Sequence, residues 1–372
     1  MKKYSKLNNI RSIFVGSAPS LRGRAGGEAV LCLLFSLLFT LTSCSNSEEG
    51  EYTLTNSIRI VSQNVSDMDV KASEGTIVVE APSSIEATAS SDWFTASVSG
   101  KTITVKTTDN LGIEYRSGKV LVKSGSDVAE VAIIQKGTII SIDAKDLYLD
   151  DSQAELEIPY TTNLDFNCQT TEDWITCKAE NGALKISTSE NATGHMRSGF
   201  VYYEAGSIKD SIYVQQCEVE KDLLGEMMLV YYDAKLGDYN ALNAEFVSST
   251  DSAGIVSYAL VLNDLGFVIP VGFNKETNTI TLNAGLNIGK FQEYEIYTTL
   301  YDYESDKVIT DNKIAISGSF FYDKDDKATY LTFDDSDKFD EFNITSLFLS
   351  AYDAQGNPIG TLQYLHFPYL MK

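Results

Sequence analysis

The feature that most constrains the fold is a duplication within the first 217 residues. Two stretches that lie 81 positions apart share three landmarks, Trp93, Asn110 and Arg116 in the first and Trp174, Asn191 and Arg197 in the second. The Trp–Asn separation is 17 positions and the Trp–Arg separation is 23 positions in both stretches. Offsets that match over about 40 residues indicate two copies of one domain.

The two copies set the domain boundaries. Each closes with a short apolar strand that ends in Gln, Val131–Gln135 in the first and Ile212–Gln215 in the second. We therefore place the first domain at residues 57–137 and the second at residues 138–217. Short alternating runs such as Thr102–Lys106, separated by Ser, Gly, Asp and Asn turns, predict about seven strands per copy. The predicted fold is all-β, with two tandem immunoglobulin-like β-sandwiches.

The shared motif resembles a known family. A Trp after a polar residue, an Asn turn, an Arg-x-Gly that opens a strand and a closing strand that ends in Gln resemble the BACON domain. The resemblance covers residues 57–217, and Cys217 departs from it where the first copy has Gly137. It implies a small immunoglobulin-like sandwich of the kind found in lipoproteins and glycan-degrading proteins of Bacteroidetes. It further implies carbohydrate or mucin binding, or a role as a spacer.

The repeated Trp and Arg residues are predicted to be structural. Trp93 and Trp174 hold the same place in both copies, so we expect each to be buried as a large core ring. The alternative is that both rings are platforms for sugar stacking. Arg116 and Arg197 open equivalent strands, and we expect each to pair with a loop carbonyl or with the Asp that precedes the Trp.

Three cysteines remain once Cys32 and Cys44 are assigned to the leader and its cleavage site. An odd number makes a poor disulfide framework for an exported protein. Cys168 and Cys177 stand where the first copy has Ala, so we expect both to fill small positions in the core as free cysteines. A Cys168–Cys177 bridge is the alternative.

The N-terminus predicts export and a lipid anchor. Residues 1–43 combine a basic head with the apolar run Ala29–Phe39, which is shorter than the ~20 residues that span a bilayer. The sequence Leu-Thr-Ser-Cys at its end resembles a bacterial lipobox, which implies a diacylglycerol on Cys44. Residues 44–56 are then the lipidated cysteine and a flexible acidic tether, similar to the export signal of Bacteroidetes surface lipoproteins. The predicted location is the outer membrane or cell surface; the sequence leaves open whether the protein faces the periplasm.

The charge of the chain excludes one class of partner. The formal net charge is −23 at pH 7, and the basic leader makes the remainder more acidic still. Nucleic-acid affinity comes from neutralising phosphates with Lys and Arg. We therefore predict no nucleic-acid binding.

Residues 219–372 form a different domain. They contain 13 Tyr and 11 Phe but no Trp and no Arg, and acidic side chains outnumber Lys more than twofold. Strand-like segments follow one another with short turns between them, which predicts an antiparallel barrel or a further sandwich. We favour a lipocalin-like up-and-down barrel.

One strand of this domain carries the candidate binding site. Alternation along residues 293–303 places Tyr294, Ile296, Thr298 and Leu300 on one face, which we expect to be core. The opposite face carries Glu293, Glu295, Tyr297, Thr299, Tyr301 and Tyr303. Tyrosine rings beside carboxylates can stack on sugars and bond to their hydroxyls, so we predict a glycan site here. Ordinary cross-strand packing of tyrosines is the alternative.

Catalysis and metal binding find little support in the sequence. It lacks the metalloprotease, serine-hydrolase and phosphate-loop motifs, so we predict that the protein is not an enzyme and has no cofactor. Acidic clusters at residues 323–326 and 334–341 lack the spacing of a calcium loop, and we predict no metal site.

The predicted function is a lipid-anchored surface protein that binds a polysaccharide or mucin glycan through residues 219–372. The two sandwiches would act mainly as spacers. One alternative is a structural lipoprotein that binds a protein partner, such as a surface transporter or an adhesin complex. The weaker alternative is a glycan-active enzyme, because the two carboxylates of a glycosidase need only spatial proximity. The sequence names neither the glycan nor the oligomeric state.

Overall fold

The computed structural model describes residues 57–334 and 343–372. The chain divides into two compact units, Met1–Thr138 and Ile139–Lys372. The leader, Cys44 and the acidic tether lie outside the described residues. Within the described residues, no helix is long and apolar enough to cross a membrane. Almost every element is a strand, so the predicted all-β fold is confirmed.

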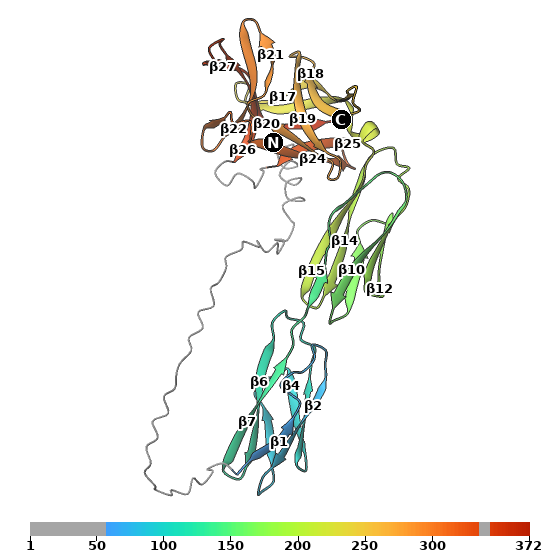
Figure 1. Cartoon of the computed structure of the whole chain (residues 1–372), viewed down its shortest axis with the longest axis vertical. Coiled ribbons are helices and arrows are strands. Elements are labelled where there is room, and N and C mark those ends of the chain that lie inside the picture. Colours follow the sequence, from blue (N-terminus) through green and yellow to red (C-terminus); the bar gives the residue numbers. More distant parts are fainter. Residues whose placement is uncertain (1–56, 335–342) are drawn as a thin grey trace, which may run out of the picture. The chain divides into compact units, whose positions relative to one another are not determined.

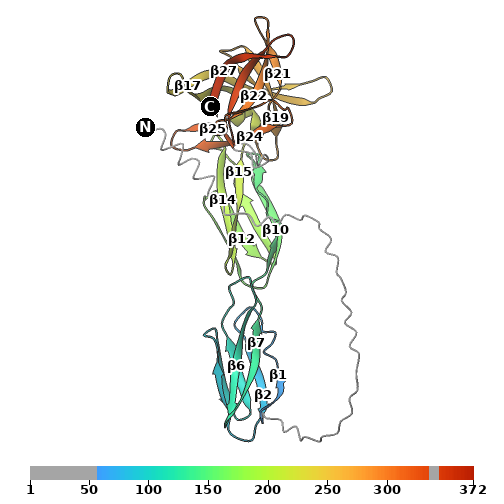
Figure 2. The same ribbon diagram turned by 90° about the vertical axis from the view of Figure 1, so that its left-hand side faces the viewer.

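The first unit contains one β-sandwich. Its strands are β1 (Arg59–Gln63), β2 (Glu74–Glu80), β3 (Glu86–Ala89), β4 (Phe94–Ser99), β5 (Thr102–Thr107), β6 (Arg116–Ser124) and β7 (Asp127–Gln135). One sheet has the order β1-β2-β5-β4 and the other the order β3-β6-β7. Figure 2 labels β1 and β2 of the first sheet and β6 and β7 of the second. Alternate residues of both sheets point inward, and Ile77, Ile103, Val120 and Ile133 are fully buried between them.

The second unit begins with another sandwich of the same kind. Its strands are β8 (Ile140–Ile142), β9 (Leu147–Leu149), β10 (Ala154–Thr162), β11 (Phe166–Thr170), β12 (Ile175–Glu180), β13 (Ala183–Thr188), β14 (Arg197–Ala205) and β15 (Ile208–Gln216). They form two four-stranded sheets, β12-β13-β10-β8 and β11-β14-β15-β9. Leu184, Ile186 and Val214 fill the core between the sheets.

The remainder of the second unit is the C-terminal domain. A short π-helical turn, η1 (Val219–Leu223), leads into it. Its strands are β16 (Gly225–Asp233), β17 (Asp238–Thr250), β18 (Val256–Leu262), β19 (Phe267–Asn274), β20 (Thr279–Asn283), β21 (Asn287–Phe291), β22 (Tyr294–Asp302), β23 (Lys307–Ile309), β24 (Ala315–Asp323), β25 (Ala328–Asp334), β26 (Ile344–Tyr352) and β27 (Pro358–Met371).

Eight of these strands close into an antiparallel barrel. The order is β16-β17-β18-β19-β20-β24-β25-β27, and β27 pairs back onto β16 through Leu229 opposite Leu370. Figure 1 labels the other barrel strands, from β17 to β20 and β24, β25 and β27. Every neighbouring pair is antiparallel, as in an up-and-down barrel. Phe246, Leu260 and Ile280 are among the side chains buried inside it.

Strands β21, β22, β23 and β26 leave the barrel and form, with part of β27, a second layer that we call the side sheet. Strands β21, β22 and β23 lie in sequence between β20 and β24, and β26 lies between β25 and β27. Strand β26 pairs with β22 and also with residues 358–366 of β27. The 14-residue strand β27 therefore belongs to the barrel by its C-terminal end and to the side sheet by the longer part before it.

The second sandwich and the barrel share one hydrophobic core. Met196 and Cys217 of the sandwich and Leu223 of η1 are buried in the same cluster as the barrel side chains. The His195 ring stacks on the Tyr322 ring with a centroid distance of 3.7 Å. On the surface, Lys324 Nζ lies 2.9 Å from Glu172 Oε2. Apolar burial and ring stacking therefore hold the two domains of this unit together.

Candidate functional site

The register of the side sheet gathers side chains of three strands on one face. Tyr301 of β22 lies opposite Ser346 of β26, which lies opposite His366 of β27. In the next row Phe348 lies between Thr299 and Tyr364. Because residues directly opposite each other point to the same side of a sheet, these six side chains share one surface. We call it the aromatic face, and it also includes Tyr297, Tyr303 and Tyr352.

The aromatic face has an inner and an outer layer. Phe348 and His366 form the inner layer, with only 4% and 7% of their surfaces exposed. Tyr303 and Tyr364 form the outer layer and are exposed by 50% and 42%. Tyr301 is half-buried between the two layers. Large rings that remain exposed over a packed layer offer a stacking surface of fixed geometry.

Ring contacts fix the outer rings in place. Tyr301 stacks on Phe348 with a centroid distance of 4.6 Å, and Tyr364 meets the same ring edge-on at 4.9 Å. Tyr303 meets the His366 ring edge-on at 5.6 Å and lies 5.4 Å from the Phe367 ring. These centroid distances are those of favourable aromatic pairs.

Hydrogen bonds fix the polar groups of the same face. The Tyr301 hydroxyl donates to Asp306 Oδ1 at 2.5 Å, and this bond raises the pKa of Tyr301 to about 12. Ser346 Oγ lies 3.1 Å from His366 Nδ1, and burial lowers the pKa of that imidazole. Ser346 is completely buried, so its hydroxyl is closed to a substrate.

The predicted site residues do not all meet at one point of this face. Tyr301 and Tyr303 lie together with ring centroids 6.4 Å apart, whereas Tyr297 packs edge-on against Tyr352 at 5.2 Å in another part of the face. The carboxylate of Glu295 is held at strand β21, where Lys290 Nζ lies 2.7 Å away. Glu295 precedes Tyr301 by six residues, which is ~20 Å along a strand.

The remaining predicted carboxylate lies in a turn. Glu293 is exposed in the hairpin turn between β21 and β22. The expected arrangement, in which tyrosines are flanked directly by Glu293 and Glu295, therefore does not form around Tyr301 and Tyr303. Of the four residues expected in the core, Ile296, Thr298 and Leu300 are buried, whereas Tyr294 stays partly exposed.

The sequence argument missed the contribution of β26 and β27. Phe348 and His366 contact the Tyr301 ring, and Tyr364 packs on Phe348, yet the sequence pattern singled out only β22 as a tyrosine-rich strand. Alternation along this segment does indicate which residues share a face, because Ser346, Phe348 and Ser350 lie two positions apart and point to the same side of a strand. What the sequence did not indicate was that β26 pairs with β22.

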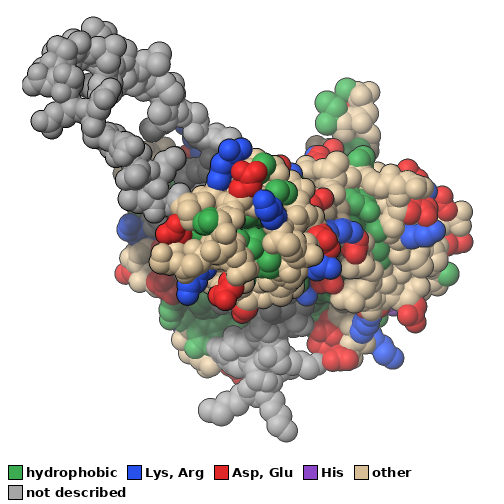
Figure 3. All heavy atoms as spheres, turned by 90° about the horizontal axis from the view of Figure 1, so that it is seen from below, with side chains coloured by type: hydrophobic (Ala, Val, Ile, Leu, Met, Phe, Trp, Pro, Cys, Tyr) green, Lys and Arg blue, Asp and Glu red, His purple; other side chains and the backbone are tan. Residues whose placement is uncertain are grey.

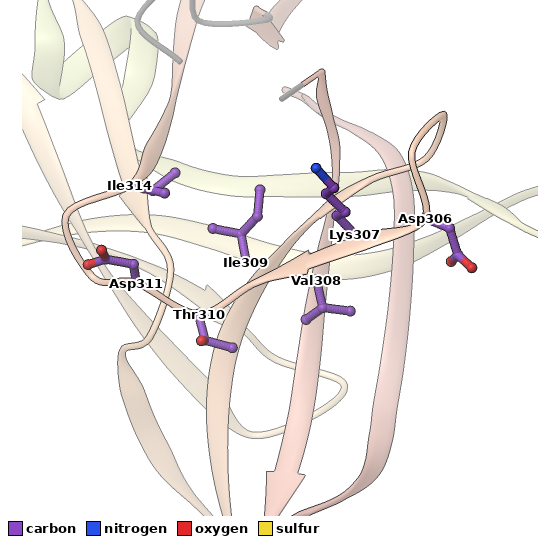
Figure 4. Close-up of a pocket in the computed structure, with 7 residues that line it drawn as sticks. All are labelled: Asp306, Lys307, Val308, Ile309, Thr310, Asp311 and Ile314. Atoms are coloured by element: carbon purple, nitrogen blue, oxygen red, sulfur yellow. The ribbon is translucent and has the colours of Figure 1, made fainter. Parts of the chain in front are cut away.

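An open hollow adjoins the aromatic face. It measures about 540 Å³ and is lined by Asp306, Lys307, Val308, Ile309, Thr310, Asp311 and Ile314 (Figure 4). Val308 of β23 lies opposite Tyr301 of β22, so the two side chains point to the same side of the sheet. The hollow and the aromatic face are therefore contiguous.

The tryptophans of the sandwiches are not buried as expected. Trp93 and Trp174 are both partly exposed, and each lies beneath a guanidinium, at 4.5 Å from Arg116 and 4.3 Å from Arg197. The buried position is the next residue, Phe94 in the first copy. The rings pack on the edge of the core and are capped by a cation, which accounts for the fixed Trp–Arg spacing without a ligand.

The two arginines bond to loop carbonyls and to a Gln rather than to Asp92 or Asp173. Arg116 Nε donates to Gln135 Oε1 at 2.8 Å, and its Nη2 donates to the Thr108 carbonyl at 2.7 Å. Arg197 makes the same bonds with Gln216 and Ser189. The residue equivalent to Gln135 is therefore Gln216, not Gln215 as the sequence comparison had it.

The glycine of the Arg-x-Gly motif makes room for the core. A Cβ on Gly118 would lie 2.6 Å from a ring carbon of Phe94, and one on Gly199 would lie 2.8 Å from Ile175 Cδ1. Any larger residue at these positions would push the buried side chain out of the core. Together with the Arg bonds, this gives the Trp, the Arg and the Gly of the repeat a structural role.

Cys168 and Cys177 are free thiols that lie in facing sheets of the second sandwich. Both are partly buried, in line with small positions at the edge of the core. Burial, with a hydrogen bond to Cys168, raises the pKa of Cys177 to about 12. The Cys177 thiol is thus not set up as a nucleophile.

No metal centre is found in the part of the chain that the structure describes, where no three His, Cys, Asp or Glu side chains converge on a point. Residues 335–342, which hold most of the second acidic cluster, lie outside the described residues. On the face drawn in Figure 3, Lys and Arg side chains are scattered among Asp and Glu.

The strand pairing defines the class of protein: tandem immunoglobulin-like β-sandwiches followed by a C-terminal β-barrel. A tandem of titin domains is similar over 74% of this chain and 94% of its own, at 8% identity and a TM-score of 0.32. A three-domain titin fragment covers 57% of this chain and 93% of its own, at 7% identity and a TM-score of 0.24.

An enzyme is also among the similar structures. An endo-fucoidan hydrolase from glycoside hydrolase family 107 is similar over 46% of this chain, at 12% identity and a TM-score of 0.24. The matched part is only 29% of the hydrolase's own length. No family model and no curated protein matches the chain.

Proposed function

We propose that this protein is a lipid-anchored, cell-surface carbohydrate-binding protein without catalytic activity. The aromatic face of the C-terminal domain binds the glycan, and the two sandwiches, which resemble BACON domains, act mainly as spacers. The lipid on Cys44 holds the protein at the outer membrane. The ligand class is a polysaccharide or a mucin glycan.

One observation carries the binding role: exposed tyrosine rings lie over a packed aromatic layer. Tyr303 and Tyr364 are each exposed by more than 40% although both contact buried rings. Such rings can stack on the apolar faces of sugars, and their hydroxyls can bond to sugar hydroxyls. Preorganised rings lose little conformational freedom on binding, which favours affinity.

A glycan array with the full chain tests this proposal, followed by calorimetry on the double variant Tyr303→Ala with Tyr364→Ala. We expect the affinity to fall about tenfold or more, because each stacked ring contributes on the order of 1 kcal/mol. The matched control is Tyr115→Ala with Tyr202→Ala, which removes two exposed tyrosines from the sandwiches. Equal binding by both double variants would refute the site.

A spacer or assembly role is the second candidate. The observation that favours it is the shared core of the second sandwich and the barrel, in which Met196 and Leu223 are fully buried. Such a rigid connection fixes the orientation of the barrel relative to the second sandwich. An assembly subunit that binds a transporter or adhesin partner would need a fixed orientation of this kind. Capture of one such partner, together with no binding to any glycan, would favour this candidate.

The anchor is tested separately. Changing Cys44 to Ala should leave the precursor uncleaved and free of labelled palmitate. Incorporation of palmitate into the Cys44→Ala protein would refute the lipid anchor without bearing on glycan binding. Digestion of intact cells with protease then distinguishes a surface-facing from a periplasm-facing protein.

A further inference from the structure

We infer that the ligand is an uncharged polysaccharide chain that crosses from the aromatic face into the hollow beside β23, and that carboxylates there select against sulfated and uronic-acid glycans. This inference rests on the proposed function and adds the substrate class and a further part of the site.

A cross-strand pair and a hydrogen bond place the aromatic face beside the hollow. Val308 is the cross-strand neighbour of Tyr301, and 57% of its surface is exposed. The Tyr301 hydroxyl donates to Asp306, which itself lines the hollow. A chain of sugars that stacks on Tyr303 and passes Tyr301 therefore reaches Val308 without leaving the surface.

The hollow offers both kinds of contact that a sugar needs. Figure 4 shows the side chains of Val308 and Thr310 on one side of β23, opposite those of Lys307 and Ile309. Val308 provides an apolar patch beside Tyr301, and the exposed Thr310 provides a hydroxyl. The open volume of about 540 Å³ is in the range of a small-molecule site.

The charges around this path are predominantly negative. Between residues 302 and 311 the chain has four carboxylates and one lysine, Lys307. Asp302 is buried and bonded to Ser305 and to backbone amides, so it faces away from a ligand. Asp306 and Asp311 are exposed and both line the hollow.

The lack of arginine sharpens this selection. Residues 219–372 contain no Arg, the side chain whose planar fork recognises sulfate and carboxylate groups with two parallel bonds. A sulfate or uronate in the hollow would face Asp306 and Asp311, with Lys307 as the one basic side chain of the lining and no Arg. A chain that carries only hydroxyls meets no repulsion and finds carboxylate acceptors for its hydroxyl hydrogens.

The charge selection is tested with the full chain against neutral mannan and xyloglucan and against sulfated fucoidan and polygalacturonate. We expect binding to at least one neutral polymer, little change in that affinity as salt rises, and no measurable binding to the anionic polymers. The double variant Asp306→Asn with Asp311→Asn should raise the affinity for anionic polymers about fivefold or more. Asn keeps an acceptor for Tyr301 and tolerates the positive φ of 53° at position 306.

The matched control is Glu226→Gln with Glu245→Gln, which removes two carboxylates from facing positions of β16 and β17. It should leave both affinities unchanged. Tighter binding to anionic than to neutral polymers by the wild type would overturn this inference and leave the proposed function intact. Binding to none of the polymers or arrayed glycans would overturn both.

The extension into the hollow has its own test. The double variant Val308→Ala with Thr310→Ala should lower the affinity for a hexasaccharide of the bound polymer about threefold or more. Its affinity for a disaccharide should stay unchanged, because only the longer ligand reaches β23. Equal effects on both lengths, or none on either, would overturn the extension.

Discussion

Asn278 and Gln215 bond to each other across the junction between the barrel and the second sandwich. The Asn278 amide donates to Gln215 Oε1 at 2.9 Å, and the Gln215 amide donates to the Phe320 carbonyl at 3.0 Å. Both side chains are buried, with 4% and 2% of their surfaces exposed. Because buried amides without partners are costly, this pair fixes one relative placement of the two domains.

Replacing Asn278 with Ala should lower the free energy of unfolding by ~1–3 kcal/mol, because Gln215 Oε1 would lose its partner inside the protein. The positive φ of 48° at position 278 adds strain for Ala. Urea unfolding of the full chain measures the effect. Asn357→Ala, which removes an amide from an exposed turn, is the control; equal midpoints for the two variants would contradict the expectation.

Arg116→Ala should destabilise the first sandwich by ~1–3 kcal/mol, since the change removes the cation over Trp93 and two bonds to the backbone and Gln135. Arg59→Ala is the matched control, because its ion pair with Glu80 among the described residues is exposed and 3.9 Å long. Thermal unfolding monitored by tryptophan fluorescence compares them. Identical melting temperatures would mean that the cation over the ring contributes nothing.

The stability of the C-terminal domain should fall as the pH drops below 6.5 because of His366. Burial lowers the pKa of His366 from its ordinary value of 6.5, so the unfolded chain binds this proton more readily than the folded one. The contribution is fully present above pH 6.5 and is lost as the pH falls towards the lowered pKa. Urea midpoints of wild type and His366→Gln, measured from pH 7.5 to 5, isolate it from the carboxylates. Parallel curves would contradict the expectation.

Cys177 should react slowly with iodoacetamide in the native protein at pH 8. Its pKa is raised to about 12, mainly by burial, so the thiolate is rare. Buried Cys217, whose pKa is raised further in the same direction, should react more slowly still. Mass spectrometry after timed labelling, with and without urea, gives the rates. Fast labelling of Cys177 without urea would show that the sandwich opens locally.

Tyr364 separates stacking from hydroxyl bonding within the proposed glycan site. Tyr364→Ala should weaken glycan binding about fivefold or more, whereas Tyr364→Phe, which keeps the ring over Phe348, should retain most of the affinity. Calorimetry with a bound polymer measures both. If Tyr364→Phe loses as much glycan affinity as Tyr364→Ala, the contribution of Tyr364 comes from its hydroxyl and not from stacking.

The sequence predicted the sandwiches well because their landmarks interact locally. Arg116 reaches Trp93 and Thr108 within one domain, so a fixed spacing in the chain corresponds to a fixed contact in the fold. The expected burial of the Trp rings was wrong because the spacing is equally satisfied by a ring at the core edge beneath a cation. Periodicity alone does not distinguish these two arrangements.

The aromatic face was predicted only in part because it depends on pairing between distant strands. Alternation along β22 identified Tyr301 and Tyr303, but their neighbours Phe348 and His366 come from strands that follow 40 or more residues later. The partner of Glu295 was also invisible, since it depends on the hairpin with β21 that brings Lys290 alongside. Local patterns predict which side a residue faces, not what it meets there.

The pairing of β16 with β27 has a consequence for how the domain is made. Leu229 and Leu370 are partners although about 140 positions separate them, so the barrel cannot close until synthesis has passed β27. Pairings between such distant strands form slowly. Until then β16 keeps an unpaired edge that can join a neighbouring chain. We therefore expect the C-terminal domain of a newly made chain to need a holding chaperone for longer than the sandwich domains do.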